Sequence, residues 1–216
     1  MLLLAALALQ APGGPSDSPS IALRDVATPP MAQALLDSTG WGTPQISIAT
    51  RAGPASVWLL RAADSVFVVA KVPDRTPSWA DAVSVCLDIS GDRAPTPAHD
   101  DFEFTLRRVL DSSVVYRGRN GRWQPPLDDP DWRVGATHAG GGWEAAVMSD
   151  TAGWTLVLRL DPAWLAGEGG HPPGIALMVH NDEPSSWSAW PPRQDGSPSQ
   201  DMDRTPMAWA RVQPPT

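Results

Sequence analysis

Tryptophan dominates the aromatic chemistry of this sequence. It contains 11 Trp against three Phe and one Tyr, although Phe and Tyr fill a protein core equally well. An indole at the surface offers a wide π face to the C–H surface of a ring such as a sugar, and its N–H stays free to donate a hydrogen bond. Four tryptophans lie in stretches rich in Pro, Gly and Ser, which favours loops: Trp79, Trp123, Trp187 and Trp190. The alternative is that each ring folds back to cover an open end of the core.

Polar and apolar residues alternate in two segments, which assigns them to opposite faces of a strand. In residues 82–89, Ser84 and Cys86 oppose Val83 and Val85. Residues 102–109 alternate in the same way. If the two segments are neighbours, four side chains form one polar surface over an apolar layer: Ser84, Glu103, Thr105 and Arg107. Such a surface is either ordinary solvated sheet or the floor of a binding site.

Catalytic motifs are missing from the sequence. The four histidines (His99, His138, His171 and His180) show no HExxH spacing, no GxSxG segment is present, and no glycine-rich phosphate loop follows a strand-like run. Pairs of nearby acidic residues such as Asp100 and Asp101 occur, but local carboxylate pairs are common in proteins. We therefore expect that the protein is not an enzyme.

The elements that must position these residues are mostly β-strands. The 24 prolines and 18 glycines are scattered and leave little room for long helices. We expect strands at residues 56–61, 65–72, 82–89, 102–109, 113–116, 132–139, 143–148, 154–160 and 175–180, and short helices at 31–36 and 161–165. Residues 66–70 are apolar on both faces, which is typical of a central strand covered on both sides. So many short strands predict an all-β, antiparallel β-sandwich of the jelly-roll or immunoglobulin-like type.

The amino terminus has the pattern of an export signal. Residues 1–11 are an apolar run too short to span a bilayer but long enough for a signal-peptide core, although no basic residue precedes it. A Gly, Pro and Ser-rich spacer follows at residues 13–20. We expect a signal peptide and spacer at 1–20, one sandwich domain at 21–213, a secreted or periplasmic location and no membrane insertion after cleavage. The alternative for the apolar run is a short buried helix.

Charge and cysteine content exclude several kinds of partner and site. The net charge of −8 opposes binding to nucleic acid and to anionic lipid, and it suits divalent cations. The single cysteine, Cys86, allows no intrachain disulfide and no thiolate zinc site, so we interpret it as a buried small apolar residue. We expect a monomer.

Several motifs, in one order, resemble the family 9 carbohydrate-binding modules and their DOMON-like relatives. The resemblance covers roughly residues 35–212. It depends on Val57-Trp58-Leu59-Leu60, the run 65–74, the run 79–88, His99-Asp100-Asp101-Phe102, the run 153–160 followed by Trp164-Leu165, and His180-Asn181-Asp182 leading to Trp190-Pro191. The resemblance implies a β-sandwich that binds a mono- or oligosaccharide without catalysis.

The resemblance also assigns residues to a binding site. Trp79 and Trp190 match two tryptophans that clamp a sugar. Ser84 stands where sugar-binding members have a carboxylate, and Thr105 where they have an arginine; Glu103 and Arg107 on the same face could substitute for them.

Calcium that steadies the loops is a further implication of the resemblance. It assigns the ion to Asp74, Asp81 and Asp182, with Asp100 and Asp101 nearby in the pattern. Turn formation and strand-end capping are the alternative roles of these aspartates.

Two other functions remain open at the level of sequence. DOMON-like relatives include haem-binding domains, and His138, His180 or Met148 could supply the axial ligands. The chain could also be an interaction domain without a small ligand, in which case Trp79 and Trp190 would be buried.

Overall fold

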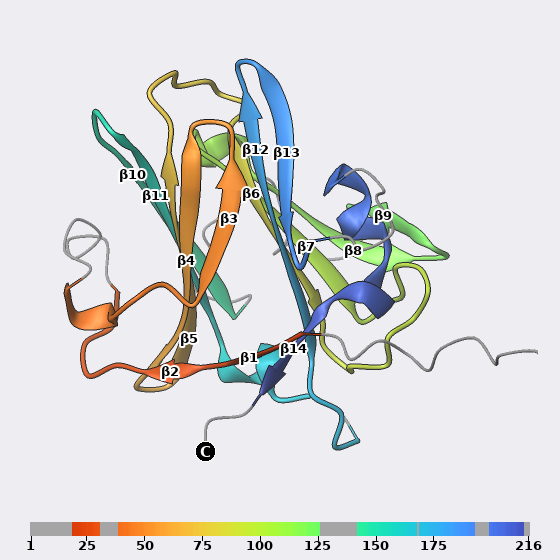
Figure 1. Cartoon of the computed structure of the whole chain (residues 1–216). Helices are drawn as coiled ribbons and strands as arrows, with labels where there is room; N and C mark the ends of the chain where they lie inside the picture. Colours follow the sequence, from red (N-terminus) through yellow and green to blue (C-terminus); the bar gives the residue numbers. More distant parts are fainter. Residues whose placement is uncertain (1–18, 31–38, 126–141, 168, 193–198, 214–216) are drawn as a thin grey trace, which may run out of the picture.

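The strand-forming runs fold into two β-sheets that pack face to face (Figure 1). The structure is a computed structural model that describes residues 19–30, 39–125, 142–167, 169–192 and 199–213. Within these ranges one sheet has eight strands, ordered β1-β14-β12-β6-β7-β8-β9 with β13 added beside β12. The other sheet has six strands, ordered β10-β11-β5-β4-β2 with β3 added beside β4. This architecture confirms the predicted all-β sandwich.

The strands of the eight-stranded sheet are β1 (Ser20–Ala22), β6 (Ala82–Asp88), β7 (Asp101–Arg107), β8 (Val114–Arg119), β9 (Arg122–Gln124), β12 (Gly174–Asp182), β13 (Ser185–Trp190) and β14 (Ala210–Gln213). Those of the six-stranded sheet are β2 (Arg24–Asp25), β3 (Ile46–Thr50), β4 (Gly53–Ala62), β5 (Ser65–Pro73), β10 (Trp143–Ser149) and β11 (Gly153–Leu160). The described helices are short 3-10 segments: η2 (Thr39–Trp41), η3 (Leu110–Ser112), η5 (Pro162–Leu165), η6 (Ser199–Arg204) and η7 (Pro206–Ala208).

Strand direction differs from the prediction at two places. The pairings of β1 with β14 and of β2 with β4 are parallel, whereas the other strand pairings are antiparallel. Both parallel pairings involve the short strands near the amino terminus, which lie at sheet edges and come from a segment that crosses from one sheet to the other. The antiparallel arrangement expected from the sequence therefore describes the body of each sheet, and both sheets are mixed.

The core lies between the sheets and follows the period-two pattern of the sequence. Val85 on β6 is paired with Phe104 on β7 and with Leu177 on β12, and all three are fully buried between the sheets. On β5, Val68 belongs to this core while Val69 belongs to a second apolar cluster on the outer face of the six-stranded sheet. This confirms that β5 is a central strand covered on both sides.

Several predicted elements lie where expected, and others cannot be compared. Residues 161–165 form η5, capped by Asp161, whose Oδ1 accepts a hydrogen bond of 2.8 Å from the Ala163 N–H. The predicted signal peptide, the helix at 31–36 and the strand at 132–139 lie outside the described residues, so these stay predictions. In the described part of the chain, no helix has the length and hydropathy needed to cross a membrane.

Candidate functional site

The outward-facing side of the eight-stranded sheet carries the polar residues that the sequence placed on one face. Antiparallel register puts Ser84 opposite Thr105 on one side and opposite Met178 on the other. The next side chains on the same face form a row across four neighbouring strands. The row contains Trp187 of β13, His180 of β12, Ala82 of β6 and Arg107 of β7. We call this side of the sheet the polar face. Since neighbouring strands are about 4.8 Å apart, Trp187 and Arg107 stand roughly 14 Å apart at the two ends of the row.

Trp79 projects from the loop that leads into β6. The loop is held by two backbone N–H groups: Ser78 N donates to Asp81 Oδ2 at 2.8 Å, and Asp81 N donates to the Ser78 carbonyl at 3.4 Å. The Trp79 side chain is 64% exposed, and its ring lies over the Arg107 guanidinium at 4.9 Å. An exposed indole held in place by a cation on one side keeps its other side open to a ligand.

Trp187 occupies the opposite end of the same row. Its ring stacks on the His180 imidazole, with centroids 4.3 Å apart and planes 20° from parallel. Both imidazole nitrogens have a partner, the Ala80 carbonyl at 3.0 Å from Nδ1 and the Ser185 hydroxyl at 3.1 Å from Nε2. His180 therefore fixes the orientation of Trp187 and ties β12 to the loop that carries Trp79.

Trp190 does not lie on the polar face. It is paired with Leu177, whose side chain is buried between the sheets, so the Trp190 ring also points inward and packs against the intersheet core. The two tryptophans that the structure brings to the ends of this row are thus Trp79 and Trp187, not the expected pair of Trp79 and Trp190. The spacing of the two residues indicates this difference. Residues 187 and 190 are three positions apart, and in a strand side chains an odd number of positions apart lie on opposite faces.

Three polar side chains beside this row form a hydrogen-bonded chain. Thr105 Oγ1 donates to Glu103 Oε1 at 2.8 Å, and the Ser84 and Thr105 hydroxyls lie 3.0 Å apart. Ser84 and Glu103 are only 1% and 7% exposed, while Thr105 and Arg107 remain half-buried. Thr105 and Arg107 can therefore reach a ligand directly, whereas Ser84 and Glu103 on the same face are buried.

Burial changes the acid–base properties of Glu103. Burial, and then the negative charge of Asp203 on η6, raise the pKa of Glu103 to about 7, against the lowering effect of hydrogen bonds from Thr105 and Ser84. Near neutral pH the carboxyl group is therefore partly protonated, so it can donate as well as accept a hydrogen bond.

Two of the three aspartates expected to bind calcium, Asp74 and Asp81, lie beside an arginine instead. Arg108 Nη1 lies 3.6 Å from Asp74 Oδ2 and 3.4 Å from Asp81 Oδ2, and both carboxylates are buried. Asp182 accepts a hydrogen bond of 2.6 Å from the Ser78 hydroxyl, and its backbone N–H donates to Asp81 at 3.1 Å. Because the Arg108 guanidinium already supplies the positive charge between Asp74 and Asp81, this group does not fit a calcium ion in this arrangement.

Hydrogen bonds also set the pKa of Asp74. Burial alone would raise the pKa of Asp74, but hydrogen bonds from Thr76, Asp81 and Asn181 lower it overall. The role of Arg108 could not be predicted from the sequence, because its partners Asp74 and Asp81 come from distant loops.

The two candidate haem ligands in the described part of the chain, Met148 and His180, do not form a pair. Met148 packs with the apolar cluster on the outer face of the six-stranded sheet, whereas His180 lies on the outer face of the eight-stranded sheet. The whole sandwich therefore separates the two side chains, and one iron cannot bind both. His138 lies outside the described residues.

Comparison with known proteins identifies the architecture. No protein-family model matches the chain, and no curated protein is similar to it in sequence. Among solved structures, it is similar to a family 9 carbohydrate-binding module from Caldicellulosiruptor kristjanssonii in complex with glucose, with 14% identity, a TM-score of 0.52, and coverage of 91% of this chain and 97% of that one. The same kind of module in complex with cellotriose gives 14% identity, a TM-score of 0.51, and coverage of 91% and 95%. The chain therefore has the β-sandwich fold of the family 9 carbohydrate-binding modules.

Proposed function

We propose that this chain is a non-catalytic carbohydrate-binding domain that holds a mono- or oligosaccharide on the polar face, between Trp79 and Trp187. The observation that carries the proposal is the exposure of Trp79 at the rim of that face, above Arg107. A large apolar ring costs free energy when it is left in water, and stacking against a sugar removes part of that cost.

Each accessible residue of the row has a role in the proposed site. Trp79 and Trp187 supply apolar faces at the two ends, and a saccharide chain lying along the row touches both. Arg107, at the Trp79 end of the row, and Thr105, beside the row, donate hydrogen bonds to hydroxyl groups, as few but well-placed polar groups do in saccharide sites. The similar modules named above bind glucose and cellotriose, which supports a neutral sugar as the ligand class.

Substitution of the two tryptophans tests the proposal. We expect Trp79→Ala and Trp187→Ala each to weaken saccharide binding by roughly 5- to 150-fold, because stacking on one aromatic ring contributes about 1–3 kcal/mol. The measurement is a glycan array with the full chain, followed by calorimetric titration of the best ligand.

Met207→Ala is the matched control, because Met207 is also exposed and apolar but lies on η7, away from the row. It should bind like the unmodified protein, and thermal unfolding should show that all variants fold. If the unmodified chain binds no glycan, or if both tryptophan variants bind normally, the proposal is wrong.

A further inference from the structure

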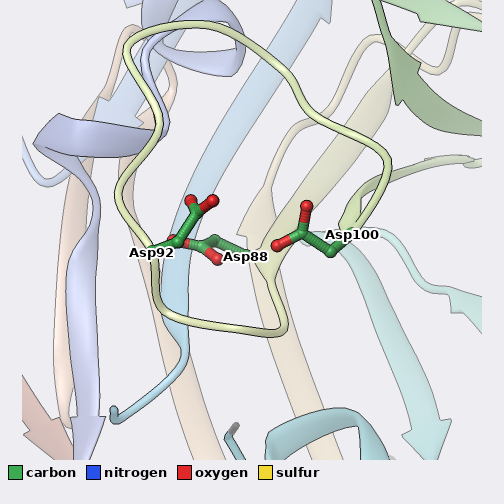
Figure 2. Close-up of side chains that lie close together, drawn as sticks. All are labelled: Asp88, Asp92 and Asp100. Carbon is green, nitrogen blue, oxygen red and sulfur yellow. The ribbon is translucent and has the colours of Figure 1, made fainter. Parts of the chain in front are cut away.

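Three aspartates at the end of β6 meet in one place although the chain separates them by up to 12 positions. Asp88 ends β6, and Asp92 and Asp100 come from the loop between β6 and β7. Figure 2 shows their carboxylates turned toward one another. One carboxylate oxygen of each lies within 4.8 Å of the others, so the three can contact a single small cation.

The local fold holds all three carboxylates in position, Asp100 through a hydrogen bond that it accepts from the Ser90 hydroxyl. Asp88 accepts hydrogen bonds from the Gly91 N–H at 2.7 Å and the Arg93 N–H at 3.0 Å. Asp92 accepts one from the Ala94 N–H at 2.8 Å. These bonds bend the loop back over the end of β6, and Gly91, with a φ of +68°, supplies the left-handed backbone that the bend requires.

A fourth carboxylate points to a ligand at this position. Asp101 is paired directly with Asp88 across the antiparallel strands, so both side chains stand side by side on the same face of the sheet. Asp101 is 0% exposed, and its Oδ2 accepts a hydrogen bond of 2.6 Å from the Ala98 N–H. Its Oδ1 is buried with no hydrogen-bond partner. A buried carboxylate oxygen without a partner is unfavourable, and a bound cation would remove that cost.

Among the described residues, no arginine or lysine forms an ion pair with Asp88, Asp92 or Asp100, in contrast to Asp74 and Asp81. Asp100 has an exposed neighbour, His99, whose Nδ1 lies 3.4 Å from Oδ1. Arg108, by contrast, carries a permanent charge between Asp74 and Asp81.

We propose that Asp88, Asp92 and Asp100, with Asp101 beside them, bind one calcium ion. Calcium takes oxygen ligands at 2.3–2.6 Å, so oxygens on opposite sides of the ion are about 5 Å apart, which the spacing of this group allows. Magnesium requires shorter bonds and near-octahedral geometry, which suits a group of loop carboxylates less well. The position includes Asp100 and Asp101, which the resemblance placed nearby in the pattern, but not Asp74, Asp81 and Asp182, where Arg108 takes the place of the cation.

The ion would stabilise more than one loop. Within the loop between β6 and β7, the Ala94 carbonyl accepts a hydrogen bond of 3.1 Å from the Met207 N–H of η7, and the Pro97 carbonyl accepts one of 3.1 Å from the Gly121 N–H of the hairpin between β8 and β9. A cation that fixes this loop therefore also fixes the hairpin and the carboxyl-terminal segment.

Calcium titration of the full chain tests the site. After treatment with chelator, we expect calcium to bind the protein in a 1:1 ratio by calorimetry and to raise the temperature of thermal unfolding. Asp92→Asn and Asp100→Asn should each weaken calcium binding at least ~10-fold, since each removes a charged oxygen ligand. Both positions lie in the loop, so the variants avoid the fully buried Asp88 and Asp101.

The matched control is Asp64→Asn, an exposed aspartate in the turn between β4 and β5, and it should bind calcium as the unmodified chain does. Absence of binding and of any thermal shift in the unmodified chain at calcium concentrations up to ~10 mM, well above the range of extracellular calcium modules, overturns the proposal. So does normal binding by both loop variants. The titration uses no saccharide, so its outcome is independent of the proposed sugar site.

Discussion

Glu103 shows what the fold does to a single carboxyl group. It accepts a hydrogen bond from Thr105 on the polar face, yet it is almost fully removed from water. Removing a carboxylate from water favours its neutral form, and the nearby charge of Asp203 acts in the same direction. Its pKa of about 7 lies well above the value of about 4.5 that the group has in an unfolded chain. The native state therefore retains a proton that the unfolded state loses between these two values.

The stability of the protein should consequently fall as pH rises through this window. A folded-state pKa raised above the unfolded value gives stability that is present at low pH and is lost as pH approaches 7. Glu103→Gln cannot ionise, so we expect it to be more stable than the unmodified chain by roughly 2–3 kcal/mol at pH 8 and to show little difference at pH 4. Urea unfolding of both proteins at pH 4, 6 and 8, in chelator, measures the difference.

This comparison isolates one carboxyl group. Asp101 and Asp203 also have raised pKa values, but both proteins contain them, so their contributions cancel in the difference. A gap in stability between the two proteins that is the same at all three pH values would show that Glu103 does not titrate in this range.

At the scale of elements, loops that fold back onto strands decide which side chains meet. The long loop between β6 and β7 returns over the sheet so that Ala98 lies against Gly118 of β8. A Cβ atom at position 118 would stand 2.1 Å from the Ala98 carbonyl oxygen and 2.8 Å from its nitrogen. The loop can approach the strand this closely only because residue 118 has no side chain.

A methyl group at this position should therefore destabilise the fold. We expect Gly118→Ala to lower the free energy of unfolding by about 1–3 kcal/mol, the usual cost of forcing extra volume into a packed contact. Gly40→Ala is the control, because a Cβ there meets nothing within 4 Å. Urea unfolding checks both variants, and a Gly118→Ala protein as stable as the control would contradict the close approach.

Local sequence pattern predicted the body of each sheet and missed elements that depend on distant partners. Alternation fixed which residues of β6 and β7 face outward, and apolar residues on both faces identified β5 as central. The strand β13 was missed because its sequence, Ser-Ser-Trp-Ser-Ala-Trp, lacks β-branched residues and resembles a loop. Pairing with β12 makes it a strand, and this pairing decides that Trp187 rather than Trp190 faces the polar side.

The same reasoning explains the candidate sites. Ser84, Glu103, Thr105 and Arg107 could be grouped from sequence because neighbouring strands carry them in register. Arg108 could not be placed between Asp74 and Asp81, because Asp81 is 27 positions away along the chain and Asp74 is farther still. The proximity of Asp92 to Asp88 likewise depends on the bend of a loop, which no period in the sequence predicts.

At the scale of the whole molecule, the carboxyl-terminal segment closes one part of the polar face. Figure 1 shows the 3-10 segments η6 and η7 on the side of the eight-stranded sheet away from the six-stranded sheet. There Met202 and Trp209 bury Cys86 of β6, and Trp209 Nε1 donates a hydrogen bond of 2.8 Å to the Met202 carbonyl. The segment thus covers the middle of the face and leaves the row with Trp79 and Trp187 at its end.

Cys86 provides a direct probe of this cover. The thiol is 0% exposed, and burial, followed by the charges of Glu103 and Asp203, raises the pKa of Cys86 well above its usual range, so a thiol reagent should label the folded protein slowly. Trp209→Ala removes the ring that covers it. We expect the loss of this packing to lower the free energy of local opening of the segment by about 3 kcal/mol. Labelling of Cys86 under native conditions should then be roughly a hundredfold faster.

The comparison with Met207→Ala separates local opening from a general loss of stability. Met207 belongs to the same segment but is exposed, so its removal should leave the labelling rate unchanged. Circular dichroism should show that Trp209→Ala keeps its strands. If labelling of Trp209→Ala is as slow as that of the unmodified chain, the segment is held by β14 alone, and the ring of Trp209 is not what closes this part of the face.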